Sequence, residues 1–299
     1  MSEEKPINIH SPSPAKFTEQ SGSVYLVYAN GETKKQDTYA VDNVIYHPMP
    51  RTPWETCDVT MTTDYKALWK DTSVFIHENN DLPDDRLEDV LTAWVFSSWV
   101  PELGDVAPYI FTLGIKNSGK TRLLETLKLL SYRGIKSGDC SDASVPRIIE
   151  AYHPTMFFDE TERYNSKDSN MQSTLNAGYK RGDFAIRVQD PKMNTLAFFD
   201  TFGYKALAGT EPMRGTLESR CIMINMQKNS RPVAFKLDTV KAREIRSRLL
   251  WWRFKQLEKH EGVEGSEGIE GVPEELSFSD GRFCELYAPL VKVAKEVWC

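Results

Sequence analysis

One eight-residue segment, Gly114-Ile-Lys-Asn-Ser-Gly-Lys-Thr121, constrains the possible folds of this chain more than any other feature. It matches G-x-x-x-x-G-K-[ST] without a mismatch, and it lies between the apolar run Tyr109–Leu113 and a helical pattern over 119–130. Glycines allow successive backbone N–H groups to turn toward phosphate oxygens, and a helix that begins there adds the positive end of its dipole. The segment therefore predicts a phosphate-binding loop between a buried strand and a helix.

Two residues of this loop have specific expected tasks. Lys120 is predicted to neutralise the β- and γ-phosphates of a nucleotide, and the hydroxyl of Thr121 to join the coordination of Mg²⁺. ATP and Mg²⁺ are therefore the expected cofactors. The other candidate cofactor-binding residues are Gly114, Asn117, Ser118, Gly119 and Arg122.

A pair of acidic residues follows a second apolar run about 40 residues after the loop. In Phe157-Phe158-Asp159-Glu160, Asp159 is placed to hold Mg²⁺, and Glu160 is placed to polarise a water molecule for attack on the γ-phosphate. Taken alone, such a pair could equally be a helix cap or a solvated turn. Together with the loop it predicts hydrolysis, because transfer to a bound hydroxyl does not need a water-activating glutamate.

Strand-like and helix-like segments alternate through the centre of the chain. The sequence predicts an α/β fold: a parallel sheet flanked by helices, as in P-loop NTPases. The expected strands are 109–113, 155–158, 205–208 and 221–226, and the expected helices are 84–100, 119–130, a segment around 147–152, 239–260 and one from 281 onward. A hairpin is expected from 185–188 and 195–199.

We predict four parts along the chain. Asn30-Gly31, which tolerates positive φ at both turn positions, indicates a hairpin in the N-terminal part. The predicted parts are a flexible leader over 1–20, a β-rich module over 21–80, the ATPase core over 81–238, and a helical lid-like part over 239–299 with an acidic Gly/Glu loop at 261–275.

Composition excludes several classes of protein. No apolar run approaches the ~18 residues of a membrane-spanning helix, and the polar N-terminus lacks a secretory signal. Five scattered cysteines without a CxxC pair argue against a disulfide framework and favour a reducing cytoplasm. The net charge of the whole chain is −6, yet the expected helix over 241–259 contains seven Lys or Arg and only two Glu. The net charge therefore does not indicate whether the protein binds DNA.

At this point the sequence resembles a family, the AAA+ ATPases. More narrowly, it is similar to ATPases that are found beside or fused to primase domains in phages, plasmids and integrated elements. The resemblance spans about residues 85–298. It rests on LTAWVFSSWV, GIKNSGKTRLLETLKLLSY, FFDETER, LNAGYKRGDFAIRV, YKALAGTEPMRGTLESRCIMINM and GRFCELYAPLVKVA.

The resemblance implies roles for residues outside the loop. Thr210 matches the polar residue that contacts the γ-phosphate or the attacking water, and Arg220 matches an arginine finger inserted into the site of a neighbouring subunit. A surface cation is the alternative for Arg220. Either Arg243 or Arg246 could be a second phosphate sensor. A finger acting in a neighbour implies a homo-oligomeric ring, expected to be a hexamer, with a primase or another replication protein as a further partner.

The predicted hairpin lies where several ring helicases carry one that points into the central pore. Lys192 at its tip is a candidate DNA contact, and Arg181 and Arg187 near its base are two more, because Lys and Arg suit sequence-independent backbone contacts. A solvated lysine on an ordinary hairpin is the alternative. The expected function is Mg²⁺-dependent ATP hydrolysis that drives DNA unwinding or remodelling in replication of a mobile element. A protein-remodelling or switch ATPase, a small-substrate phosphotransferase and a non-enzymatic ATP-gated DNA scaffold stay open.

Overall fold

The protein is described from a computed structural model. The described residues are 7–10, 17–20, 24–29, 32–36, 38–41, 44–47, 52–138, 140–164, 170–190, 195–213, 215–260, 273, 276 and 280–298. Lys192, Cys299, the turn residues Asn30-Gly31 and nearly all of the 261–275 loop lie outside them.

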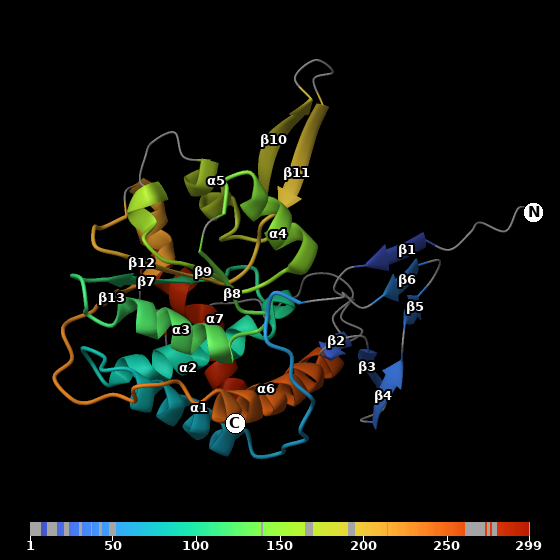
Figure 1. The fold of residues 1–299 in the computed structure, drawn as a ribbon, viewed down its shortest axis with the longest axis horizontal. Coiled ribbons are helices and arrows are strands. Elements are labelled where there is room, and N and C mark those ends of the chain that lie inside the picture. The colour runs from blue at the N-terminus through green and yellow to red at the C-terminus, as the bar shows by residue number, and fades with distance from the viewer. Residues whose placement is uncertain are drawn as a thin grey trace, which may run out of the picture.

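A five-stranded parallel sheet forms the centre of the molecule (Figure 1). Its spatial order is β13-β7-β12-β9-β8, so β12 lies between the strand before the phosphate loop and the strand before the acidic pair. The strands are β7 (Tyr109–Leu113), β8 (Ile135–Ser137), β9 (Met156–Phe158), β12 (Lys205–Gly209) and β13 (Cys221–Asn225). The predicted α/β class with a parallel sheet flanked by helices is confirmed.

The register of the sheet brings the chemically important segments to one edge. Leu113 pairs with Gly209, and Leu207 pairs with Phe158. The residues that follow β7, β9 and β12 therefore meet at the carboxyl edge of the sheet, where ligands of open parallel sheets usually bind.

Helices cover both faces of this sheet, and Figure 1 shows α1, α2, α3 and α6 on one side and α4 and α5 on the other. The helices are α1 (Tyr65–Asn79), α2 (Arg86–Ser98), α3 (Lys120–Leu130), α4 (Ser144–Tyr152), α5 (Asn170–Ala177), α6 (Thr239–Lys259) and α7 (Gly281–Trp298). Short 3₁₀ turns in the described ranges include η1 (Pro101–Leu103), η2 (Thr161–Tyr164) and η3 (Gly215–Arg220).

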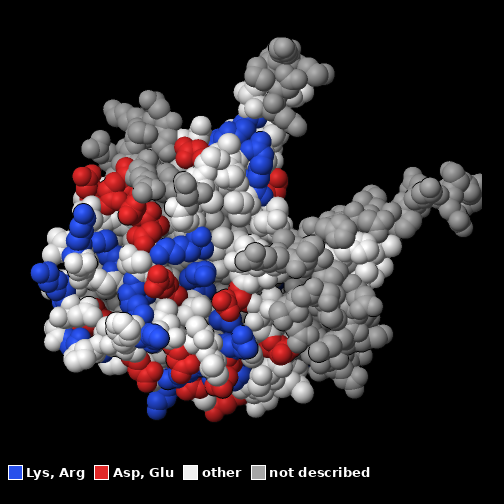
Figure 2. Space-filling model, in the orientation of Figure 1, with Lys and Arg blue, Asp and Glu red and all other residues white. Residues whose placement is uncertain are grey.

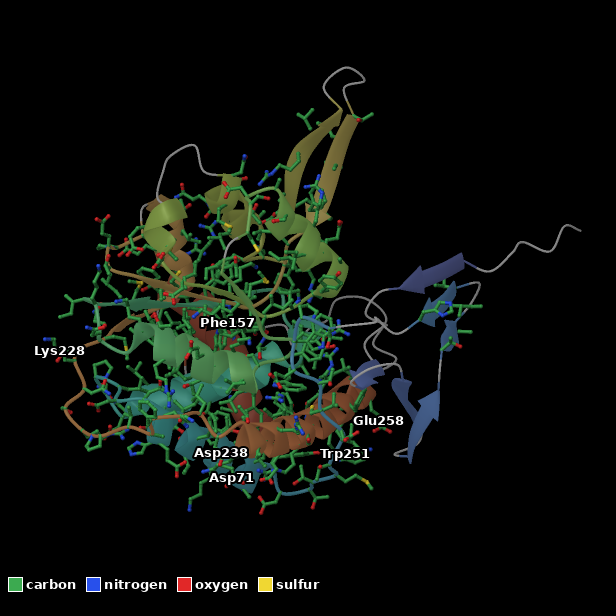
Figure 3. All side chains as sticks on the ribbon, in the orientation of Figure 1. Asp71, Phe157, Lys228, Asp238, Trp251 and Glu258 are labelled. Carbon is green, nitrogen blue, oxygen red and sulfur yellow. The ribbon has the colours of Figure 1, made fainter. Side chains whose placement is uncertain are left out.

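Large aromatic side chains join the helical layer to the sheet. Trp94 of α2 is fully buried and packs edge-on against Phe157 of β9, which lies in the interior in Figure 3. Trp252 of α6 is also fully buried, with its ring centroid 5.1 Å from that of Phe96. Such edge-to-face pairs add to the burial of large apolar areas. Helix α6 is thus part of the core.

Two predicted boundaries need correction. Residues 65–79, assigned by the sequence to a β-rich module, form helix α1, which packs against α2, α3, α6 and α7. The part over 239–299 is helical as expected, yet α6 packs on α1 and α3 as one more helix of the core layer and is not a separate lid. Burial of apolar helix faces against one another explains both differences.

Short strands precede residue 52. The strands β1 (Ile7–His10), β5 (Tyr39–Val41) and β6 (Val44–His47) form one sheet, and β2 (Phe17–Gln20), β3 (Val24–Ala29) and β4 (Glu32–Gln36) form another. Residues 7–10 and 17–20, predicted to belong to a flexible leader, are therefore paired strands. The hairpin around residues 30–31 is confirmed by the pairing of Ala29 with Glu32.

A second hairpin projects from the core beside α4 and α5 (Figure 1). Its strands, β10 (Phe184–Asp190) and β11 (Thr195–Asp200), pair in antiparallel register, as the sequence predicts. Within the described ranges, no helix has the length and apolar character that a bilayer crossing requires. Within the same ranges, Cys57, Cys140 and Cys221 are free thiols.

Candidate functional site

The phosphate loop folds tightly between β7 and α3. Asn117 and Gly119 both have left-handed φ values, 63° and 84°, a region that Asn and Gly adopt more readily than other residues. At Gly114, a Cβ atom would lie 2.5 Å from the Met226 carbonyl oxygen and 2.6 Å from Ser118 Oγ. These contacts explain why glycine is required at this position.

Lys120 begins α3 and points back over the loop. Its Nζ donates hydrogen bonds to the carbonyl oxygens of Gly114 at 2.5 Å and Ile115 at 2.7 Å. Burial lowers the pKa of Lys120, while the negative charges of Glu162 and Asp159 oppose that shift. The ammonium group thus lies within the electrostatic reach of two carboxylates that follow β9.

The predicted acidic pair lies where β9 ends. Asp159 forms an ion pair with Lys136 of the neighbouring strand β8, with 3.3 Å between Nζ and Oδ2, and its Oδ1 accepts a hydrogen bond from the Glu160 backbone N–H. Glu160 is exposed and adopts a left-handed φ of 56°, so the chain turns sharply after Asp159. The sequence did not indicate Lys136, because β8 is too short to be recognised as a strand.

A third acid, Glu162, was missed by the sequence analysis. The backbone N–H and the hydroxyl of Thr210 both donate to Glu162 Oε1, the hydroxyl at 2.5 Å. Burial raises the pKa of Glu162, but these hydrogen bonds and the charge of Lys120 outweigh it and lower the pKa overall. Thr210, predicted to sense the γ-phosphate, is therefore linked to the acidic segment. Glu162 could have been suspected from its place two residues after Glu160.

These residues fit a Mg²⁺-nucleotide. Ser118 Oγ is buried with no hydrogen-bond partner among the described residues, and the Gly114 loop leaves no room for a side chain. Thr121 and Asp159 supply hard oxygen ligands, which suit Mg²⁺. Within the described part of the chain, His, Cys, Asp and Glu side chains form no cluster of three that could hold a metal. A magnesium ion here would depend largely on phosphate and water oxygens, as is usual for this cation.

A cavity of about 470 Å³ opens beside the loop. The end of α1 and the segment that follows β13 form its walls, and Arg122 joins them by donating to Asn79 Oδ1 and to the Ala234 carbonyl oxygen. Asp81 also binds Ser230, with 2.9 Å between Ser230 Oγ and Oδ2. The lining residues are Asn79, Asn80, Asp81, Asn117, Gly119, Arg122, Met226, Asn229, Val233, Ala234 and Phe235. Arg122, a predicted nucleotide contact, thus holds this wall together.

Arg220 lies at the opposite edge of the sheet. It immediately precedes β13, whose first residue, Cys221, pairs with Tyr109, the first residue of β7. Arg220 is therefore level with Pro108. Since Pro108 is six residues before Gly114, Arg220 lies about 20 Å from the start of the phosphate loop along the strand direction. Its Nη1 donates to the Thr216 carbonyl oxygen at 2.8 Å. Arg220 cannot serve the phosphate loop of its own chain.

The arginines suggested as DNA contacts bind within the fold. Arg181 donates to the carbonyl oxygens of Pro101 and Gly104, and its guanidinium lies 4.4 Å from the Phe202 ring centroid. Arg187 donates to Thr174 Oγ1 at 2.8 Å. Their role in DNA binding stays a prediction.

The two arginines considered as phosphate sensors lie on α6. Arg246 is buried and donates to the Leu129 carbonyl oxygen. Leu129 is nine residues along α3 from Lys120, about 14 Å from the loop end. Arg243 is exposed. Arg246 thus contacts the end of α3 that is remote from the phosphate loop.

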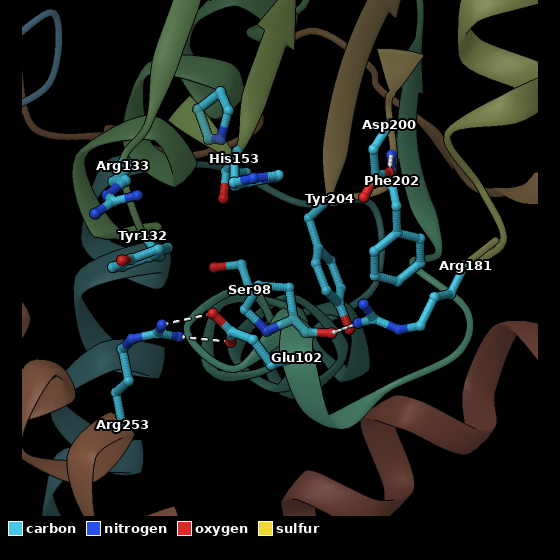
Figure 4. A pocket seen from close by; sticks show the side chains of 14 residues that line it. Ser98, Glu102, Tyr132, Arg133, His153, Arg181, Asp200, Phe202, Tyr204 and Arg253 are labelled. Carbon is cyan, nitrogen blue, oxygen red and sulfur yellow. Dashed lines mark hydrogen bonds and ion pairs between the residues drawn. The ribbon is translucent and has the colours of Figure 1, made fainter. Parts of the chain in front are cut away.

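A second cavity, of about 270 Å³, lies where β8, β9 and β12 begin (Figure 4). Arg253, Arg181 and His153 line it, and two hydrogen bonds of 2.6 and 2.8 Å join Arg253 to Glu102. Burial lowers the pKa of His153, although nearby Asp200 opposes this shift. Because the guanidinium groups of Arg253 and Arg181 already donate to groups of the fold, we assign these cations to stabilising the junction of α6, η1 and the sheet.

No protein-family model matches this sequence, and no curated protein matches it. Among solved structures, C. elegans PCH-2 matches with a TM-score of 0.33 and 12% identity, over 72% of this chain and 65% of that chain. This chain therefore spans less than two thirds of the length of that protein. A full-length MCM homolog from Methanopyrus kandleri matches with a TM-score of 0.46 and 10% identity, over 94% of this chain and 70% of that one. Matches at identities this low carry no information about activity or partners.

Proposed function

We propose that this chain is an AAA+-type P-loop ATPase that hydrolyses ATP with Mg²⁺ in a homo-oligomeric ring. The observation that carries the proposal is the meeting of the phosphate loop, Asp159, Glu160 and Thr210 at one edge of a parallel sheet. The resemblance of the sequence to AAA+ ATPases supports the same function.

Each residue has a chemical task in this proposal. Lys120 and the loop N–H groups bind the phosphates. Thr121 and Asp159 would hold the metal, which when bound would neutralise charge that develops on the phosphate oxygens. Glu160 accepts a proton from the attacking water, and Arg220 of a neighbouring copy stabilises the transition state. The cavity lined by Phe235 and Asn79 receives the nucleoside.

Lys120→Ala tests the assignment of the site. Without the ammonium group, we expect MgATP affinity to fall at least tenfold and phosphate release to become undetectable. Lys128→Ala, at the far end of the same helix, is the matched control and should behave like the wild type. Phosphate release that persists in Lys120→Ala would contradict the proposal. Release without any added acceptor also separates hydrolysis from small-substrate phosphotransfer.

DNA is the substrate that we propose for the ring. The sequence resemblance and the projecting hairpin, with Lys192 in the connection between its strands, support this choice. Figure 2 shows Lys and Arg interspersed with Asp and Glu among the described residues of the face that it presents, so a local contact fits better than a broad basic surface.

The DNA proposal is tested by turnover with single-stranded and forked DNA. We expect DNA to raise the rate severalfold and Lys192→Ala to weaken that rise, while the rate without DNA stays unchanged. Lys180→Ala, at an exposed lysine that precedes the hairpin, is the control. A rate that does not respond to any DNA would favour protein remodelling instead.

A further inference from the structure

The cavity beside the phosphate loop is lined by the most exposed large apolar side chain of the described ranges. The side chain of Phe235 is 92% exposed, whereas the next in order, Met61, is 71% exposed. Exposed apolar residues scattered singly need no explanation, but this one lies in the cavity to which we assign the nucleoside. An aromatic ring with a free face at that place is suited to stacking on a nucleobase.

The backbone that carries this ring is fixed to two helices. The Ala234 N–H donates to the Glu78 carbonyl oxygen of α1 at 3.0 Å. Arg122 of α3 donates to the carbonyl oxygens of Ala234 and Phe235, the latter at 3.4 Å. Because these bonds fix the main chain, only the side-chain torsions of Phe235 have to be ordered when a base stacks on it, which keeps the entropic cost of binding low.

The polar side chains where α1 ends are already engaged within the fold. Asn79 and Asn80 each donate from Nδ2 to the carbonyl oxygen four residues earlier, at 2.8 and 2.9 Å. Asn79 Oδ1 also accepts from Arg122 at 3.3 Å, and Asp81 Oδ2 accepts from the backbone N–H and the hydroxyl of Ser230. A base that hydrogen-bonded to any of these three side chains would have to compete with these internal bonds.

The two other amide side chains of the cavity lie at the loop. Asn117 belongs to the phosphate loop, and Asn229 Oδ1 would be 3.5 Å from a Cβ atom placed on Gly119. Residues 233–235 add apolar side chains to the lining. A site built to hydrogen-bond its substrate rejects analogues that lack the bonding group, whereas stacking accepts every base, since each base has a π-face.

The volume of the cavity does not select a base by size either. At about 470 Å³ it lies within the range of roughly 300 to 1,000 Å³ that is usual for small-molecule sites, so it excludes neither a purine nor a pyrimidine.

We propose that Phe235 stacks on the nucleobase and that the site takes purine and pyrimidine nucleotides alike. The inference rests on the proposed phosphate site. Affinity then comes from the loop, Lys120 and the stacked ring, and the substrate class widens from ATP to nucleoside triphosphates in general. Purines should bind more tightly than pyrimidines, because their larger rings cover more of the phenyl face.

The test is calorimetric titration of the protein with the Mg²⁺ complexes of ADP, GDP, CDP, UDP and pyrophosphate, which give equilibrium affinities without turnover. The four nucleotide dissociation constants of the wild type should lie within about tenfold of one another. Phe235→Ala should raise each of them about fivefold or more and should change that of pyrophosphate less than about twofold, since only the nucleotides contain a base to stack.

Two further variants serve as controls. Phe235→Trp keeps an aromatic face and should bind the nucleotides at least as tightly as the wild type. Val240→Ala, at a 66% exposed residue five positions further along the chain, should leave all five dissociation constants unchanged. Because both substituted positions are exposed, the thermal unfolding midpoint of every variant should stay within about 3 °C of the wild type.

The outcomes separate this inference from the proposed function. If Phe235→Ala binds ADP as tightly as the wild type, or if ADP binds more than about a hundredfold tighter than the other three nucleotides, the inference is wrong, while binding of pyrophosphate upholds the phosphate site. If the nucleotides bind in the Phe235-dependent manner but their triphosphates release no phosphate, hydrolysis is wrong and the stacking stands. If the wild type binds neither pyrophosphate nor any nucleotide, both proposals are wrong.

Discussion

Glu162 connects three parts of the candidate site at the level of single residues. It accepts from Thr210, influences the pKa of Lys120, and follows the Asp159-Glu160 pair in η2. If Thr210 senses the γ-phosphate, Glu162 fixes the direction in which its hydroxyl points. Glu162 is thus a positioning residue in the proposed mechanism.

We therefore predict that Glu162→Gln lowers ATP turnover about tenfold and changes MgATP affinity less than threefold, since it alters the orientation of catalytic groups while the phosphate loop stays intact. Steady-state phosphate release and nucleotide titration measure the two quantities. Glu211→Gln, a nearby exposed acid, serves as the control. Equal turnover in Glu162→Gln and wild type would contradict the assigned role.

Lys205 is an ionisable side chain buried in the core of the protein. It is 1% exposed at the start of β12, and its Nζ donates to the carbonyl oxygens of Thr201, Gly203 and Gly178 at 2.8, 2.9 and 3.3 Å. Burial lowers the pKa of Lys205 to about 7, although the charge of Asp200 opposes the shift. Between pH 7 and 10.5 the unfolded chain therefore holds a proton on Lys205 that the folded chain has lost.

Because unfolding takes up this proton, the free energy of unfolding should rise with pH across that window. Between pH 7.5 and 9.5 we predict that the wild type gains about 2 kcal/mol relative to Lys205→Met, which has no titratable group there. Urea denaturation at both pH values provides the comparison. The exposed lysine variant Lys180→Met should follow the wild type, and parallel pH profiles for Lys205→Met and wild type would refute the prediction.

At the scale of elements, Arg253 joins α6 to η1. Its guanidinium is 1% exposed and forms two hydrogen bonds with Glu102, whose side chain is 40% exposed. The same group lies 4.3 Å from the Tyr132 ring centroid. If the pair is broken, water can therefore solvate the Glu102 carboxylate much better than the Arg253 guanidinium.

This difference predicts an asymmetry between two substitutions. Glu102→Ala leaves a buried cation without its carboxylate and should lower the free energy of unfolding by about 3 kcal/mol. Arg253→Met leaves a half-exposed carboxylate that water can solvate, so its cost should be clearly smaller. Chemical denaturation of both variants and of the double variant measures the difference. Equal losses of unfolding free energy in Glu102→Ala and Arg253→Met would show that burial of Arg253 does not determine the cost of breaking the pair.

The sequence predicted those elements that carry strong local signals. Tyr109–Leu113, the helix after the loop and the β10–β11 hairpin were found because apolar runs, a phosphate motif and turn residues mark them. Helix α1 was missed although Asp64 caps it, accepting from the Ala67 backbone N–H at 2.8 Å. The predicted β-rich module was inferred from the segments around Asn30-Gly31 and extended to residue 80, and packing against α2 and α6 identifies the helix.

Other features depend on contacts that no local pattern encodes. Strand β8 has three residues and exists because β9 pairs with it, and the ion pair between Lys136 and Asp159 follows from that pairing. The cavity beside the loop is formed by segments about 150 residues apart, held together by Asp81 and Ser230. The sequence identified the phosphate loop and the acidic pair but could not find their long-range supports.

At the scale of the whole molecule, the phosphate loop and Arg220 occupy opposite edges of one sheet. Copies joined by these two edges would contact one another head to tail, and such contacts form a ring when the rotation between copies closes. Arg220→Ala and Glu160→Gln should each be inactive alone. In an equal mixture, about a quarter of the sites would combine an intact Glu160 with an intact neighbouring Arg220.

Mixing these two variants should therefore restore measurable phosphate release, up to about a quarter of the wild-type rate per site. A mixture of Arg220→Ala with Lys120→Ala is expected to recover in the same way, since the defects again lie in different copies. Arg220→Ala mixed with Arg220→Lys provides the control, because both lack the planar guanidinium. Absence of recovery in the first two mixtures would exclude a finger that acts between copies.

The ion pair between Lys136 and Asp159 bears on the order in which ligands arrive. An ammonium group 3.3 Å from the candidate metal ligand already compensates its charge, so a free divalent ion would have to displace Lys136 for the gain of one carboxylate. A metal ion that arrives already bound to triphosphate brings its own oxygen ligands and gains the loop as well. Under the proposed function, a metal–nucleotide complex would therefore compete with Lys136 for Asp159 better than a free ion would, and Glu125 Oε1, 3.6 Å from the Nζ of Lys136, offers that ammonium group a second carboxylate.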